Sequence, residues 1–367
     1  MDPCLDDLRR YAVARSLFKP TTLLRAVHRL GFVQADPIRA PARAQDLTLR
    51  HRVAGYQAGV LQQRYPALPL EEGFFVNYGF LPCASHALLQ PRLPKLVWPP
   101  ERQALAQQVL DYVAEHGVVH PSQVAAHFAQ GKVVTWFGGS AHATTELLDG
   151  MHYRGQLRVA GRQGGTRLYA VPLPLAGDAA GPLSLEDRMA RLVARIVQAY
   201  APLPVASLNQ LVGYLAHGDA HWKATCRAAA KEVLAHLAQA EVQGVRWCWP
   251  ADEQPRSAKW QVGRQVRLLA PFDPVVWDRR RFELLWGWRY RFEAYTPAPK
   301  RVLGYYAMPL LWGDQVIGWG NLAVEQGQLQ ARLHYVAGSA PTAADYAPAL
   351  AAELAAMAQF LGLDPAV

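Results

Sequence analysis

The stretch "GQLRVAGRQGGTRLYAV", residues 155–171, decides how the middle of this chain folds. Apolar and polar residues alternate on both sides of a glycine-rich centre, a pattern typical of two antiparallel strands joined by a tight turn. We therefore predict strands at residues 156–160 and 166–171, with the turn at residues 161–165. The elements that precede this hairpin indicate which type of domain contains it.

Three helical patterns come before this hairpin. Apolar residues at helical spacing predict a helix from about residue 101 that ends near residues 116–117, and Pro121 opens a second, short helix that buries Val124 and Phe128. A third helix is predicted at residues 140–152. Helix, helix, helix, hairpin is the order of a winged helix-turn-helix domain, whose third helix commonly enters the major groove of DNA.

The same order is predicted a second time, and a third related unit is expected at the N-terminus. From residue 184 to about residue 263, three helical patterns precede predicted strands within "EVQGVRWCWP" and "AKWQVG". The tract "PLPLAGDAAGPL", residues 172–183, links the two stretches. The N-terminal hundred residues also begin with two helices, the second at residues 21–30 with Thr21 or Thr22 as its N-cap.

The pattern changes near residue 266 to short alternating strands, with turns at Gly313-Asp314 and Gln326-Gly327. This favours a small closed or half-closed barrel, covered by a helix at residues 341–361. We therefore predict an α+β fold of three tandem winged helix-turn-helix domains followed by a small β-barrel domain. The predicted domain boundaries are 1–98, 99–175, 183–263 and 264–367.

Composition narrows the class of protein. The 367 residues include no apolar run of the roughly 18–20 needed to span a bilayer, and the acidic N-terminus lacks an apolar signal region, so we expect a cytoplasmic protein without a membrane partner. The four cysteines have no zinc-ligand spacing, so we expect reduced thiols, no metal and no cofactor. A net charge of +9, carried mostly by arginine, favours a nucleic-acid partner without establishing one.

Three segments resemble a known family. "LGFVQADPI" at residues 30–38, "LLAPFDPVVWDRRR" at 268–281 and "YTPAPKRVLGYYAMPLLWGDQVIG" at 295–318 are similar to segments of the YcaQ/AlkZ-like winged-helix DNA glycosylases. The resemblance implies tandem winged helices and a barrel around a DNA channel, with Gln34 and Asp36 as the catalytic pair. Two positions depart from the family: Ala35 replaces a larger apolar residue, and Val76 stands where we would place a histidine.

The chemistry of Gln34 and Asp36 suits this role. A carboxylate can stabilise a sugar cation and accept a proton from water, and an amide can hold that water in line. Residues two apart on an extended segment point to the same side, and Pro37 favours the extended conformation at Asp36, so we expect Ala35 to point into the protein. The alternative is that Asp36 caps the following turn and that Gln34 is solvated.

Arginines near the motif and in two later segments are candidates for phosphate contact, although solvated or paired arginines are the alternative. The DNA-binding candidates are Arg39, Arg43, Arg50, Arg52, Arg154, Arg158, Arg162, Arg167, Arg279, Arg280 and Arg281.

We therefore expect a monomeric, monofunctional DNA N-glycosylase that is associated with the nucleoid. It would act on N7-alkylated purines, and on crosslinks, in damaged double-stranded DNA. The competing hypothesis is a DNA-binding regulator or architectural protein without catalysis, built from the same winged helices.

Overall fold

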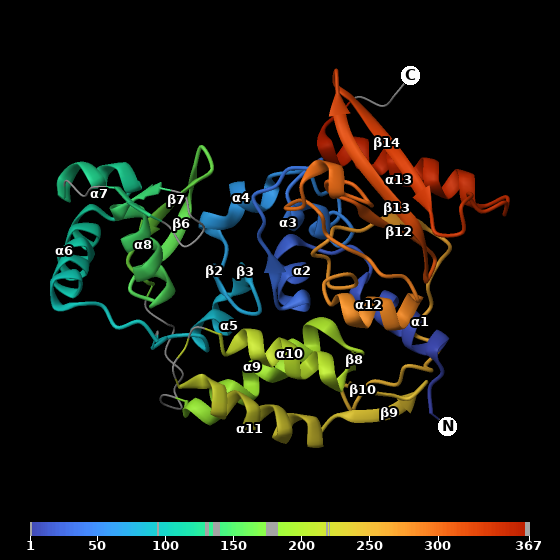
Figure 1. Cartoon of the computed structure of the whole chain (residues 1–367), viewed down its shortest axis with the longest axis horizontal. Helices are drawn as coiled ribbons and strands as arrows, with labels where there is room; N and C mark the ends of the chain where they lie inside the picture. The colour runs from blue at the N-terminus through green and yellow to red at the C-terminus, as the bar shows by residue number, and fades with distance from the viewer. Residues whose placement is uncertain are drawn as a thin grey trace. The chain divides into compact units, whose positions relative to one another are not determined.

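The computed structural model describes residues 2–93, 95–128, 132–134, 140–173, 183–217, 219 and 221–363. The chain forms two compact units. Unit 1 comprises Met1–Leu61, Ala194–Leu211 and Ala230–Val367, and unit 2 comprises Gln62–Val193 and Val212–Ala229. The division between them falls within four helices, labelled in Figure 1: α4 (Val60–Arg64), α9 (Leu185–Tyr200), α10 (Val205–Leu215) and α11 (Trp222–Ala235).

The N-terminal part of unit 1 begins with two helices, as predicted. The Thr22 hydroxyl caps the second helix by accepting a hydrogen bond from the Arg25 N–H at 3.4 Å, and Gly31 ends that helix at φ 73°. Thr22, rather than Thr21, is therefore the N-cap. The described elements of this part are α1 (Leu5–Ser16), α2 (Leu23–Leu30), β1 (Val33–Gln34) and α3 (Ala44–Leu49).

Unit 1 contains a small antiparallel sheet, of which one strand precedes α10 and the other two follow α11. Its strands are β8 (Leu203–Pro204), β9 (Ala238–Val242) and β10 (Val245–Trp249), in the order β8-β10-β9. The prediction of a strand at residues 258–263 is wrong. Gln243 and Gly244 both adopt positive φ, so the hairpin turns there and closes between residues 238 and 249.

The C-terminal part of unit 1 is a four-stranded antiparallel sheet in the order β11-β12-β13-β14. Both predicted turns are confirmed, between β12 and β13 and between β13 and β14. In the described residues β11 and β14 are the two edges, so this is a half-barrel, the half-closed alternative. The segment also contains a helix that the sequence analysis did not predict. The Asp278 carboxylate caps the first turn of this helix. Its elements, several of them labelled in Figure 1, are β11 (Val266–Leu268), α12 (Arg279–Trp286), η2 (Ala298–Lys300), β12 (Met308–Trp312), β13 (Gln315–Glu325), β14 (Gln328–Tyr335) and α13 (Tyr346–Leu361).

Unit 2 contains the stretch on which the fold prediction rests. Its hairpin is confirmed, but the turn is shorter than predicted, because Gly164 and Gly165 alone take the positive φ values that a two-residue turn requires. The third predicted helix begins at Ala143, since residues 140–142 form a strand. Most of the predicted linker at residues 172–183 lies outside the described residues. The elements are η1 (Tyr65–Ala67), β2 (Leu70–Phe74), β3 (Tyr78–Pro82), α5 (Cys83–Ala87), α6 (Pro100–His116), α7 (Pro121–Phe128), β4 (Lys132–Val134), β5 (Ser140–His142), α8 (Ala143–Tyr153), β6 (Arg158–Gln163) and β7 (Thr166–Ala170).

A buried ion pair joins an N-terminal and a C-terminal segment of unit 1. The Arg52 guanidinium donates to both carboxylate oxygens of Asp273, at 2.7 and 2.9 Å, and neither side chain is exposed to solvent. The remaining donors of Arg52 reach the carbonyl oxygens of Ser16 and Thr48, at 2.8 and 2.7 Å, and the Ser16 hydroxyl at 3.2 Å. Every part of this guanidinium therefore serves the packing of α1 and α3 against the C-terminal segment.

Loss of this pair should destabilise the protein strongly. We expect Arg52→Met to lower the free energy of unfolding by about 3–5 kcal/mol, because it leaves the Asp273 carboxylate buried and unpaired. Urea denaturation measures this loss. The double variant Arg52→Met/Asp273→Leu should be more stable than Arg52→Met alone. The control is Arg264→Met, which removes an exposed ion pair with Asp345 and should leave the midpoint unchanged. A loss for Arg52→Met no larger than this control contradicts the role given to the pair.

Candidate active site

The segment that carries Gln34 and Asp36 is fixed at both ends. Gly31 stops α2, and the buried side chains of Phe32 and Val33 anchor the chain that leaves it. On the far side, the Ile38 N–H donates to Asp36 Oδ1 at 2.9 Å, across Pro37. The capping alternative for Asp36 is therefore observed at one carboxylate oxygen. Oδ2 has no hydrogen-bond partner in the part of the chain that the structure describes.

Gln34 is buried, so the alternative of a solvated amide is wrong. Only 7% of the residue is exposed, and its Oε1 accepts a hydrogen bond from the Trp277 indole N–H at 2.5 Å. An indole nitrogen can only donate, and this fixes which end of the amide is oxygen. No other hydrogen bond to this side chain is found within the described ranges, so Oε1 keeps a second lone pair and the Nε2 group keeps its donors.

Trp277 is a site residue that sequence reasoning missed. It is held from both sides: its backbone N–H donates to the Asp273 carbonyl at 2.8 Å, and its ring lies 5.6 Å from that of Tyr200. The next residue, Asp278, caps α12 by accepting from the N–H groups of Arg280 and Arg281. The only signal in the sequence was that Trp277 lies within one of the family-like segments.

Asp36 is also buried, with 8% of the residue exposed, while its backbone N–H donates to Gln45 Oε1 at 3.2 Å. Burial raises the pKa of the Asp36 carboxyl above its usual value, although the hydrogen bond from Ile38 acts in the opposite direction. The expectation that Ala35 points into the protein is wrong, because Ala35 is more exposed than both of its neighbours. Gln34 and Asp36 are instead on the more buried side of the segment.

Three of the predicted DNA-binding arginines of unit 1 are internal. Arg52 belongs to the ion pair with Asp273, and Arg50 forms a buried ion pair with Glu353 of α13. Arg281 donates to the carbonyl oxygens of Tyr200 and Val275 from a fully buried position. Because these guanidinium groups are enclosed, Arg50, Arg52 and Arg281 are not part of the DNA-contacting set proposed below.

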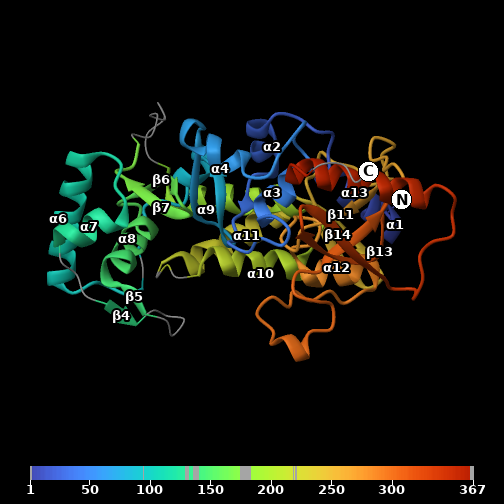
Figure 2. The same ribbon diagram turned by 90° about the horizontal axis from the view of Figure 1, so that it is seen from above.

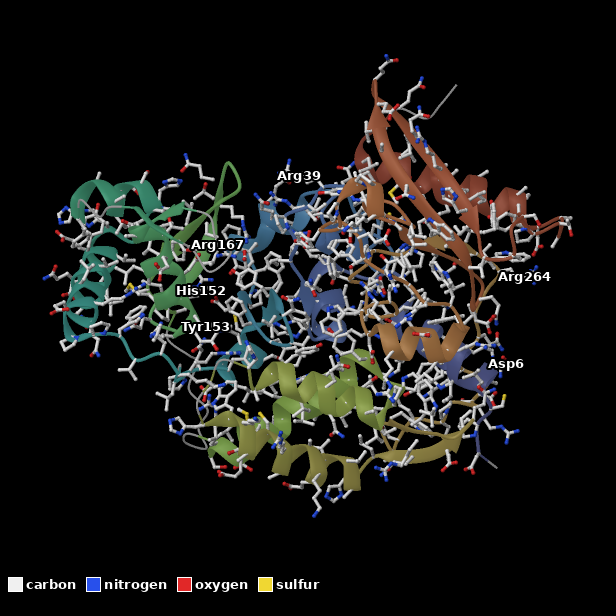
Figure 3. All side chains as sticks on the ribbon, in the orientation of Figure 1. Asp6, Arg39, His152, Tyr153, Arg167 and Arg264 are labelled. Carbon is white, nitrogen blue, oxygen red and sulfur yellow. The ribbon has the colours of Figure 1, made fainter. Side chains whose placement is uncertain are left out.

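The four predicted arginines of unit 2 all have partners within that unit. Arg158 and Arg162 pair with the buried carboxylates of Glu71 and Glu72 on β2, so the hairpin of β6 and β7 is tied to another strand. Arg154 lies over a tryptophan ring, and Arg167, labelled in Figure 3, pairs with an aspartate. Their partners are Trp98 for Arg154, at 3.6 Å from the ring centroid, and Asp149 for Arg167, at 2.8 Å.

The other arginines near the motif and on α12 differ in exposure. Arg39 and Arg280 are exposed, and neither side chain forms an ion pair or hydrogen bond among the described residues. Arg43 is half-buried, and Arg279 is half-buried over the ring of Tyr290, 4.5 Å from its centroid. Figure 3 labels Arg39. Arg39 and Arg280 are thus the two most accessible cations of the predicted set.

The position of the family departure lies in unit 2. Val76 is buried there, and the neighbouring Asn77 is exposed, with its Oδ1 accepting from the Tyr78 N–H at 2.7 Å. His86, in the same unit, is enclosed, and burial lowers the pKa of its imidazole to about 3. A histidine in this setting is neutral at physiological pH.

The described residues show neither a cluster of metal-binding side chains nor a membrane-spanning helix. They contain no group of three or more histidine, cysteine or acidic side chains placed to hold a metal ion. No described helix is both long enough and apolar enough to cross a bilayer.

Comparison with known proteins places this arrangement in a family. Among solved structures, the DNA glycosylase AlkZ of Streptomyces sahachiroi has a TM-score of 0.66 over 99% of this chain and 98% of that chain, at 15% sequence identity. At this identity the likeness shows a shared mixed helix and sheet fold. The sequence model of the family described as "DNA glycosylase AlkZ-like" matches residues 27–360. Because that match covers almost the whole chain, the protein belongs to the AlkZ-like DNA glycosylase family.

Proposed function

We propose that this protein hydrolyses the N-glycosidic bond of N7-alkylated purines in double-stranded DNA, and that it also unhooks interstrand crosslinks at such bases. The observation that carries the proposal is the buried pair of Gln34 and Asp36, held by Trp277 and Ile38, in a chain of the glycosylase family. The pair offers a carboxylate and an amide but no amine, which supports a monofunctional enzyme that uses water as its nucleophile.

The reaction needs little beyond this pair. As the bond between the sugar and the base breaks, the sugar gains positive charge, which the Asp36 carboxylate stabilises. The Gln34 amide orients a water molecule, and Asp36 takes a proton from it as the water oxygen bonds to the sugar carbon. The electron pair of the broken bond passes to the base. A purine alkylated at N7 is already cationic, so it leaves as a neutral molecule and requires no strong acid.

The same proposal includes three tandem winged-helix domains, at residues 1–98, 99–175 and 183–263, and a half-barrel domain at residues 264–367. The order of elements supports this division. Three helices precede a hairpin in both the second stretch and the third, ending at β6–β7 and β9–β10. The protein would act as a monomer on chromosomal DNA.

Base release from alkylated DNA tests the catalytic assignment. In single-turnover assays on duplex DNA that contains 7-methylguanine, Asp36→Asn should lower the rate constant by about 10²–10⁴-fold, and Gln34→Ala by about 10²-fold. The matched controls are Asp6→Asn and Gln330→Ala, at exposed positions, which should keep wild-type rates. Undiminished release by both site variants contradicts the assignment. Sequence-specific binding of undamaged DNA without any base release supports the alternative of a regulator.

The pH dependence follows from the burial of Asp36. Its raised pKa means that the proton which blocks its role as a base binds at a higher pH than for an ordinary aspartate. We expect the single-turnover rate to fall as the pH is lowered through a value above about 4. Measurement between about pH 4 and pH 8, corrected for spontaneous depurination, checks this. An acid limb at or below the ordinary carboxyl value contradicts it.

Burial of Asp36 also has a consequence for stability. Since its pKa is raised in the folded protein, the ionised carboxylate costs stability at every pH above that value. Asp36→Asn should therefore be at least as stable as the wild type at neutral pH, by up to about 1 kcal/mol. Thermal unfolding of this variant also shows that any loss of activity is not a loss of fold.

DNA contact is proposed for the two accessible arginines, Arg39 and Arg280. Each alanine variant should bind undamaged duplex more weakly and should lower the slope of log affinity against log salt by about one. Fluorescence anisotropy over a series of salt concentrations measures both. The control is Arg264→Ala, whose charge is already neutralised by Asp345. An unchanged slope in both variants would remove these residues from the DNA surface.

A further inference from the structure

The backbone N–H of Asp36 takes its acceptor from a buried side chain of another element. β1 ends at Gln34, two residues earlier, and the Asp36 N–H donates to Gln45 Oε1 at 3.2 Å. Both partners are enclosed, with 8% of Asp36 and 6% of Gln45 exposed. Because an N–H can only donate, the end of the Gln45 amide that faces it must be the oxygen. A buried N–H requires an acceptor, and Gln45 supplies one at the residue that we propose as the base.

The helix that carries Gln45 is itself held firmly. Gln45 is the second residue of α3, labelled in Figure 2, and every residue of this helix is buried. The next residue, Asp46, accepts a hydrogen bond from the Tyr56 hydroxyl at 2.7 Å, and that hydroxyl accepts the Leu61 N–H at 3.1 Å. At the other end of α3, the C-cap residue Arg50 forms its buried ion pair with α13. The Gln45 amide therefore projects from a fixed origin.

Three contacts restrain the candidate site, and they act on different parts of it. The Trp277 indole holds the amide of Gln34, and the Ile38 N–H holds Oδ1 of Asp36. The contact from Gln45 differs because it holds the main chain at Asp36 itself. A rotation of the main chain at this residue would carry the whole carboxylate with it.

We propose that Gln45 is a positioning residue, which fixes the main chain at Asp36 and thereby the direction in which Oδ2 faces the attacking water. This inference rests on the proposed glycosylase function. Gln45 acts through Asp36, so it should affect the rate of base release and not the affinity for DNA. A displacement of about 1 Å in a reacting group can slow a reaction by about 10²-fold, so a lost restraint at the base is measurable.

The variant Gln45→Met removes the acceptor and keeps an unbranched side chain of similar length. In single-turnover release of 7-methylguanine, it should slow the reaction about 10-fold and leave the Kd for the duplex unchanged. Its melting temperature should fall, since the Asp36 N–H is left buried and unpaired. Rates are therefore compared at a temperature at which circular dichroism shows the variant to be folded. The matched control is Gln57→Met, at an exposed position of unit 1, which should change neither the rate nor the melting temperature.

The variant Gln45→Glu gives a readout that a merely structural role would not produce. Its carboxylate still accepts the Asp36 N–H, so the rate at high pH should stay close to that of the wild type. Its negative charge lies beside Asp36 and raises the pKa of that carboxyl, so the acid limb of the rate should move to higher pH by about one unit. The same exchange at the exposed control, Gln57→Glu, should leave the acid limb in place.

Other titratable groups near the change do not obscure this shift. Tyr295 and Tyr306 interact with the charge of Asp36, but the pKa of each hydroxyl is raised, mainly by burial, so both stay neutral across the acid limb. Asp46 is the carboxyl next to Gln45 in the chain, and burial raises its pKa too. Asp46→Asn should keep the wild-type acid limb, because Asp46 takes no part in the reaction.

A double-variant cycle shows whether Gln45 acts through Asp36. If it does, Gln45→Met should slow the Asp36→Asn enzyme by less than about twofold. Equal slowing in both backgrounds, a wild-type rate constant for folded Gln45→Met, or an unmoved acid limb in Gln45→Glu overturns the inference while the glycosylase function stands. Absence of base release by the wild-type protein overturns the proposed function, and the inference with it.

Discussion

The buried pair of Arg52 and Asp273 holds an N-terminal segment against a C-terminal one, and it also sets the position of Trp277. The carbonyl oxygen of Asp273 accepts the N–H groups of Val276 and Trp277, both at 2.8 Å, so the pair sets the turn from which the indole of Trp277 reaches Gln34. An enclosed guanidinium whose N–H groups are hydrogen-bonded tolerates little displacement, because any shift would break those bonds. The orientation of the candidate site thereby depends on an interaction that takes no part in its chemistry.

The site itself contains a group that a structure optimised only for stability would avoid. Among the described residues, no cation lies beside the enclosed carboxylate of Asp36. Enclosing an ionised group costs free energy in the folded state. Functional sites commonly keep such groups because a substrate or a bound water later satisfies them. The indole of Trp277 holds the neighbouring Gln34 in place.

The positive charge of the chain is a poor guide to its surface. Many of the arginines that the sequence suggested for DNA contact form ion pairs inside the protein. Arg52 and Arg50 tie the N-terminal helices to the C-terminal half-barrel, and Arg158 and Arg162 tie the hairpin of unit 2 to β2. The net charge counts these arginines as though all their guanidinium groups were available to contact DNA. Only their acidic partners, which lie 87 to 303 positions away in the sequence, show that they are not.

Local signals in the sequence determined the elements of this protein and the adjacency of its two key polar residues. Thr22 starts a helix, Gly164-Gly165 turns a hairpin, and the spacing of Gln34 and Asp36 puts both on the same side of a short segment, because each effect acts over a few residues. Where a local signal was missed, as at the Asp278 cap of α12, the prediction failed. The tertiary structure alone decided that this side is the buried one, and that Trp277 holds an amide 243 positions away. These contacts arise from the packing of distant segments, which no local propensity encodes.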